Sequence, residues 1–146
     1  MTKSEVKKLE ERIAKLDVSP ITMSRPVISR FWHRSWNPDE NIPWQFFVEM
    51  QLTGLELAEI RQLDMQKESS EEPALRDRWN TLIEAAELRA EKLGEKPWRD
   101  WFTYFKAHVW PKMNEPLQIP PGDERCFFWD WKIKWFNEYR EQEAKH

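Results

Sequence analysis

The side chains that could do acid–base chemistry are few and widely spaced in this chain. The three histidines, His33, His108 and His146, lie far apart. Asp100, Tyr104 and His108 stand four residues apart, so on a helix they would stack along one edge. Such an edge could form an acid–base chain in which Tyr104 orients His108. The same spacing is typical of a solvated helix edge, which is the interpretation we favour.

No pattern in the sequence predicts a metal, cofactor or nucleophile site. No Cys/His pair has zinc-ligand spacing, no carboxylate cluster resembles a calcium loop, and the three glycines are isolated. The single cysteine, Cys126, precedes an aromatic run and fits a small core residue. One cysteine cannot form an internal disulfide, which favours a reducing compartment. The sequence therefore predicts a protein that is not an enzyme and has no cofactor or metal.

Tryptophan is the unusual feature of the composition, with ten in 146 residues. Three of them fall on apolar helical stripes, where core packing explains them: Trp79, Trp98 and Trp101. Trp110 lies off the apolar face of its predicted helix, and Trp32 and Trp36 alternate with basic side chains. The sequence leaves open whether these remaining tryptophans lie in the core or at the surface.

Charge is unevenly distributed although the net charge is only −3. Residues 37–95 hold six basic against fourteen acidic residues. Residues 22–36 hold three arginines and no acid, and residues 96–113 hold four basic residues and one acid. Both basic stretches carry tryptophan. Such asymmetry indicates binding partners rather than a particular fold.

Tryptophan beside arginine fits two kinds of binding surface. One is a protein interface, in which large rigid rings act as hot spots. The other is a surface for RNA or single-stranded DNA, on which rings stack against bases and cations contact phosphates. The acidic centre of the chain opposes wide nucleic-acid contact. Both interpretations use the same candidate residues: Arg25, Arg30, Trp32, His33, Arg34, Trp36, Arg99, Lys106, Trp110 and Lys112.

Residues 1–21 predict a peripheral amphipathic helix that Ser4 caps and that ends near Leu16. A helix this short is marginal alone, so it must dock, preferably on its own domain. The same N-terminal sequence has no apolar run typical of a secretory signal, and no stretch is apolar enough to span a bilayer. We therefore expect a cytoplasmic protein with no membrane contact.

Residues 73–110 show the clearest pattern. Pro73 suits the first turn of a helix, and the apolar stripe that follows ends at Gly94, a typical stop residue. A second apolar stripe starts at Pro97. The short join predicts an antiparallel helical hairpin.

The segment 126–136 fits two structures. Its aromatic residues alternate with charged ones, as in a strand. On a helical wheel they form one broad arc that only Lys132 interrupts, and the charged tail continues this pattern, so we favour a helix.

Taken together, the patterns predict an all-α fold, with residues 1–146 forming a single small domain of five or six helices around the 73–110 hairpin. Minor strand content near 27–52 or 126–136 remains compatible with the sequence. The predicted function is a protein–protein interaction module, an adaptor or a small subunit of a larger assembly. The alternative is a helical accessory subunit of a nucleoprotein complex that contacts nucleic acid through the basic-aromatic stretches.

Overall fold

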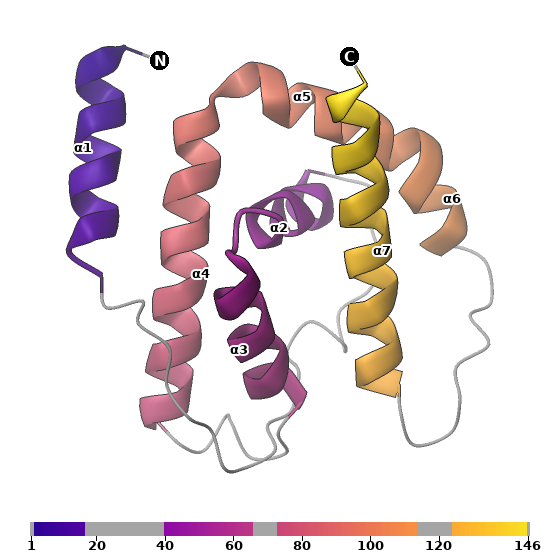
Figure 1. Cartoon of the computed structure of the whole chain (residues 1–146), viewed down its shortest axis with the longest axis horizontal. Helices are drawn as coiled ribbons and strands as arrows, with labels where there is room; N and C mark the ends of the chain where they lie inside the picture. Colours follow the sequence, from indigo (N-terminus) through magenta and orange to yellow (C-terminus); the bar gives the residue numbers. More distant parts are fainter. Residues whose placement is uncertain (1, 17–39, 66–72, 114–123, 146) are drawn as a thin grey trace.

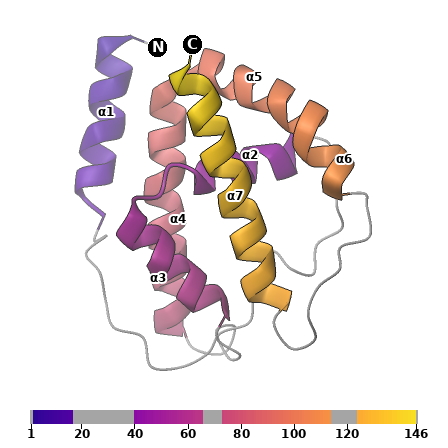
Figure 2. The ribbon, with the colours of Figure 1, turned by 45° about the vertical axis from the view of Figure 1, so that its right-hand side comes forward.

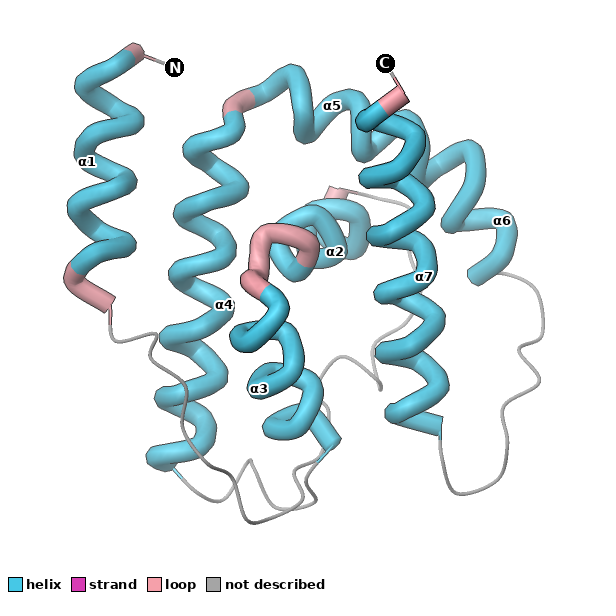
Figure 3. Tube along the Cα trace, viewed as in Figure 1, coloured by secondary structure: helices cyan, strands magenta, loops and turns pink. Residues whose placement is uncertain are grey.

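A computed structural model describes residues 2–16, 40–65, 73–113 and 124–145 of the chain. These ranges form six helices and no strand. Figures 1 and 3 show how the helices are arranged. The predicted all-α class and the helix over 126–136 are thereby confirmed. No helix in these ranges is both long enough and apolar enough to cross a membrane.

Five helices are single regular elements, and one contains a wider turn. The regular helices are α1 (Lys3–Ala14), α2 (Asn41–Glu49), α3 (Gly54–Met65), α4 (Pro73–Leu93) and α7 (Glu124–Ala144). The sixth consists of α5 (Glu95–Tyr104), the π-helical turn η1 (Phe105–Val109) and α6 (Trp110–Met113) in direct succession. A π-turn inserts one extra residue into a helix and is common next to functional sites.

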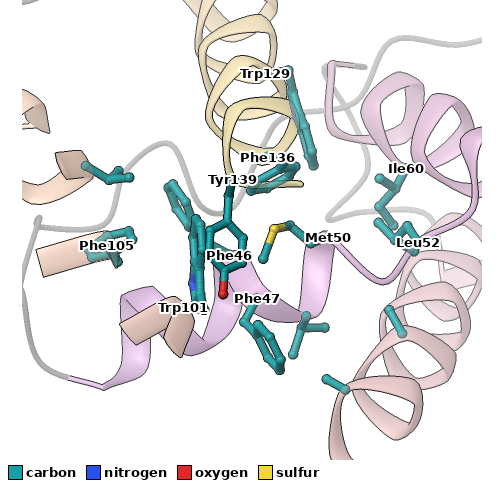
Figure 4. Packing of buried hydrophobic residues seen from close by; sticks show 14 of the residues in the cluster. Phe46, Phe47, Met50, Leu52, Ile60, Trp101, Phe105, Trp129, Phe136 and Tyr139 are labelled. Carbon is teal, nitrogen blue, oxygen red and sulfur yellow. The ribbon is translucent and has the colours of Figure 1, made fainter. Parts of the chain in front are cut away.

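The short helix α2 lies at the centre of an aromatic core. Its Phe46 and Phe47 are almost fully buried, and Figure 4 shows them among side chains from α5 and α7. The Phe46 ring meets those of Phe105 and Phe136 edge-on, with centroids 5.4 and 6.1 Å apart. Edge-to-face contacts of this kind are favourable because a ring's positive edge meets the negative face of its neighbour.

The core also encloses charged pairs. The ammonium of Lys132 lies 3.0 Å from each carboxylate oxygen of Glu49, and both side chains are almost completely buried. The Lys132 nitrogen also lies 3.7 Å from the ring centre of Trp129. Buried charges are tolerated when they are paired in this way.

Helices α4 and α5 are joined by one residue, Gly94, whose φ of 92° favours glycine. The two helices and the stop at Gly94 agree with the sequence prediction, but their antiparallel arrangement does not. Both Figure 1 and Figure 2 show α5 running across the end of α4 instead of returning along it. A single residue is too short for the usual return, since helical hairpins use loops of about 2–5 residues.

Helix α1 packs along α4, as expected for a short helix that needs support. Leu9 is its buried residue, and Glu10 pairs with Lys92 of α4 at 2.7 Å. The predicted cap was wrong by two positions. The hydroxyl of Thr2, rather than Ser4, accepts a hydrogen bond from the backbone N–H of Glu5.

Candidate functional site

The ten residues predicted from the sequence as a binding surface fall into two groups. Six of them lie outside the described residues: Arg25, Arg30, Trp32, His33, Arg34 and Trp36. The other four lie on the continuous helix from α5 to α6. Among these, Arg99 is exposed and pairs with Glu95 at 3.0 Å, and Lys106 is exposed with its nitrogen 5.0 Å from the Phe102 ring centre. Lys112 is also exposed.

The spacing predicted that Trp110 lies off the apolar face of its helix, and this prediction is wrong. It is half-buried and packs against the aromatic core. The π-turn η1 supplies the reason, because its extra residue rotates everything that follows it relative to a regular α-helix. The helical wheel used for the prediction therefore had the wrong register from Phe105 onward.

The tryptophans of the described ranges are all at least half-buried. Trp101 and Trp129 are 0% and 1% exposed. The others pack partly buried against the core: Trp44, Trp79, Trp98, Trp110, Trp131 and Trp135. Core packing therefore accounts for these eight rings, and none of them falls in the exposed class.

An open hollow of about 610 Å³ lies where the C-terminal half of α7 meets α5 and η1. Figures 1 and 2 show these two segments side by side near the C-terminus. The hollow is lined by polar and aromatic side chains: Asp100, Thr103, Tyr104, Ala107, His108, Tyr139, Gln142 and Glu143. The edge of Asp100, Tyr104 and His108 recognised in the sequence thus forms one wall.

The ring of Tyr104 contacts two other aromatic rings of the hollow. The ring centre of Tyr104 lies 4.8 Å from that of His108 and 5.0 Å from that of Tyr139. The buried Trp101 supports both tyrosines from beneath, stacked on Tyr104 at 5.7 Å and meeting Tyr139 at 5.0 Å. Trp101 is itself fixed, because its indole N–H donates to the carbonyl of Pro43 at 2.9 Å. The rings of the hollow therefore rest on a rigid part of the core.

The charged side chains at the hollow are two carboxylates and one ammonium. Asp100 and Glu143 line it, and the ammonium of Lys96 pairs with Asp100 at 2.7 Å. Burial raises the pKa of Tyr139, and a hydrogen bond to Glu143 and then the charges of Glu143 and Asp100 raise it further. Burial and then the charge of Glu138 likewise raise the pKa of Tyr104. Both phenols therefore stay protonated at neutral pH.

The Tyr139 hydroxyl lies at the buried side of the hollow. The residue is only 6% exposed, and no group meets strict hydrogen-bond geometry with its hydroxyl oxygen. A hydrogen bond to the Glu143 carboxylate, one turn further along α7, is nevertheless the second largest cause of the raised pKa of Tyr139. The carboxylate of Glu143 is therefore the neighbour that the hydroxyl faces within the chain.

Protein-family models, curated proteins and solved structures all give no match to this chain. Within the described ranges, no three His, Cys, Asp or Glu side chains gather in an arrangement that could hold a metal ion. The hollow offers ring faces, hydrogen-bonding groups and negative charge, which are the components of a binding site.

Sequence reasoning found one wall of the hollow and missed the other. Tyr139 follows the aromatic run of the last helix without a motif that marks it, and nothing in the spacing of Gln142 or Glu143 relates them to residues 100–108. Only the tertiary packing of α7 against α5 brings these walls together.

Proposed function

We propose that this chain is a non-enzymatic protein–protein interaction module, an adaptor or a small subunit of a larger assembly, and that its hollow receives part of the partner. The observation that carries the proposal is the open hollow between α7 and α5. Its aromatic rings, those of Tyr104, His108 and Tyr139, are held in place by one another and by the buried Trp101.

The physical support comes from how interfaces work. Aromatic side chains on a rigid base bury a large area for little loss of conformational entropy, which is why tyrosine is enriched among hot spots. The base under Tyr104 is the fully buried Trp101.

The test is affinity capture from nuclease-treated extract of the source cells with three forms of the protein. Ala107 is exposed and lines the hollow, so Ala107→Trp fills the hollow at little cost to the fold. Ala74 is an exposed residue at the start of α4 and outside the hollow, so Ala74→Trp is the matched control. We expect the same partner on the wild type and on Ala74→Trp, and its loss from Ala107→Trp. No partner on the wild type, or equal retention by Ala107→Trp, would overturn the proposal.

The alternative function is nucleic-acid contact, and one observation favours it. Arg99, Lys106 and Lys112 are exposed on the same continuous helix. Tryptophan fluorescence with an added single-stranded oligonucleotide distinguishes the two proposals. Quenching that weakens at high salt would support the nucleic-acid function, since phosphate contacts release counterions. The interaction-module proposal predicts no quenching at either salt concentration.

A further inference from the structure

Helix α4 buries side chains on two of its faces. One face, with Leu82 and Ala86, belongs to the main core. Ala85 and Leu88 are buried just as deeply, at 0% and 3% exposure, but they lie outside that core cluster. Together with Lys92 they follow the spacing i, i+3 and i+7, which places all three on one side of a helix. We call these three residues the second face of α4.

Helix α1 covers this second face. Figures 1 and 2 show α1 alongside α4, and the Glu10 carboxylate meets the Lys92 ammonium at 2.7 Å, which identifies the face that lies beneath α1. Leu9, the buried residue of α1, also lies outside the main core cluster. The apolar contact between the two helices is therefore a small cluster of its own, separate from the aromatic core.

This contact should open before the core does. Helix α1 has 12 residues and most of its side chains are exposed, and a helix of this length is marginal without support. The side chains of its ion pair with α4 are 40% and 53% exposed, so the pair contributes little. Segments with few buried apolar contacts open at a lower free energy than the core. When α1 leaves, Ala85 and Leu88 become an apolar strip beside the charge of Lys92.

The way in which α1 occupies the second face defines what can replace it. Its apolar side chains Val6, Leu9 and Ile13 follow helical spacing and are at least half-buried, and a carboxylate next to the central leucine meets Lys92. Any helix with the same apolar stripe and an acidic residue after its central anchor would meet the same groups. Amphipathic helices that lay such a stripe into an apolar groove are a common form of peptide recognition.

We propose that the second face of α4 is a docking site for an amphipathic helix of a partner protein, and that α1 is an autoinhibitory cover which this helix displaces. The face lies apart from the hollow, whose lining comes from α5, η1 and α7, so the proposal does not depend on the function of the hollow. Because only the open fraction of the protein can bind, the cover weakens every competing helix and excludes those that fit less well than α1.

The test uses the full chain and a fluorescent peptide with the sequence of residues 2–16 as the probe helix. Leu9→Gln weakens the docking of α1, and Lys8→Gln is the matched control, because Lys8 is exposed on the same helix. Fluorescence anisotropy should show saturable binding of the peptide to Leu9→Gln. Binding to the wild type and to Lys8→Gln should be weaker by at least about tenfold, because α1 occupies the face there. A scrambled peptide of the same composition should not bind.

An exchange of charges tests whether the peptide occupies the second face. Added to Leu9→Gln, Lys92→Glu should weaken binding of the native peptide by about two- to fivefold and strengthen binding of a peptide with Glu10→Lys by a similar factor. If the preference between the two peptides does not reverse, the assignment to this face is wrong.

Hydrogen exchange of the wild type provides a measurement without any variant. The backbone amide of Leu9 should exchange at least about a hundredfold faster than that of Phe136, which lies in the main core. Equal exchange at the two amides would overturn the proposal, as would loss of cooperative unfolding in Leu9→Gln. So would a failure of the peptide to bind Leu9→Gln, or equal binding to Leu9→Gln and the wild type. These outcomes leave the capture experiment with Ala107→Trp intact, since that experiment tests the hollow alone.

Discussion

Polar groups are arranged differently in the core and in the hollow of the molecule. In the core, Lys132 and Glu49 are buried together, and the ammonium of Lys132 reaches both carboxylate oxygens. In the hollow, the buried Tyr139 hydroxyl faces the exposed Glu143 without the strict hydrogen-bond geometry of the core pair. The two sites lie on the same helix, with Lys132 in its first half and Tyr139 in its second.

This difference separates side chains that serve the fold from side chains that are open to another molecule. A buried ion pair within the chain serves the fold, and the removal of one partner should destabilise the protein. Exposed side chains that line an open hollow contribute little to stability, so their substitution should affect binding instead.

The largest effect is expected from breaking the core pair. Lys132→Met leaves the Glu49 carboxylate buried without its counter-ion, which should lower the free energy of unfolding by about 3–5 kcal/mol. Urea denaturation followed by tryptophan fluorescence measures this loss. Lys134→Met is the matched control, because Lys134 is exposed on the same helix, and it should change stability by no more than about 0.5 kcal/mol. Similar losses for the two variants would contradict the structural role of the pair.

A second, smaller effect should depend on pH. Burial alone would raise the pKa of Glu56, but hydrogen bonds from Arg89 and from the backbone of Thr53 hold it below its ordinary value of 4.5. Ionised Glu56 therefore stabilises the folded state above that pH, and the contribution is lost as the pH falls through the lower folded pKa. Glu56→Gln should cost about 1–2 kcal/mol at pH 7, and the difference from the wild type should shrink below about pH 4.5.

Glu87→Gln is a control of opposite sign for this pH dependence. Burial, followed by the charges of Glu91 and Glu84, raises the pKa of Glu87. Its ionisation therefore opposes folding, so Glu87→Gln should raise stability slightly at neutral pH and lose that advantage in acid. Urea midpoints measured at several pH values test both variants. A constant gap between Glu56→Gln and the wild type down to pH 3 would contradict the assignment.

A third effect concerns the start of α3. The backbone N–H of Thr53 donates to the Glu56 carboxylate at 2.9 Å, and the backbone N–H of Glu56 donates to the Thr53 hydroxyl at 3.2 Å. This reciprocal arrangement is a capping box. Thr53→Ala should lower the unfolding free energy by about 1 kcal/mol. Thr81→Ala, which alters a hydroxyl within α4, should be nearly neutral. An equal loss for the two would contradict the capping role of Thr53.

The local patterns of the sequence predicted the helices better than their packing. Pro73, Gly94 and the apolar stripe between them located α4 correctly because each acts within its own helix. The π-turn at Phe105 and the steep angle at Gly94 depend on contacts with α2 and α7, which spacing along one helix does not contain.

The hollow and the core pair differ in how far the sequence could have predicted them. Lys132 interrupts the aromatic arc of α7, and Glu49 interrupts the apolar segment WQFFVEM. Two lone charges of opposite sign on apolar faces are a recognisable signal for a buried pair. Tyr139 gives no such signal, because a tyrosine in an aromatic arc is ordinary core composition until its hydroxyl is placed in three dimensions.

The substitution Ala107→Trp tests the central claim most directly, because it fills the hollow and leaves the core pair in place. Its unfolding free energy and its capture of the partner should be measured on the same preparation. We predict stability within about 0.5 kcal/mol of that of the wild type, together with loss of the captured partner. Partner capture equal to that of Ala74→Trp would contradict the account, because the hollow would then not be the binding surface.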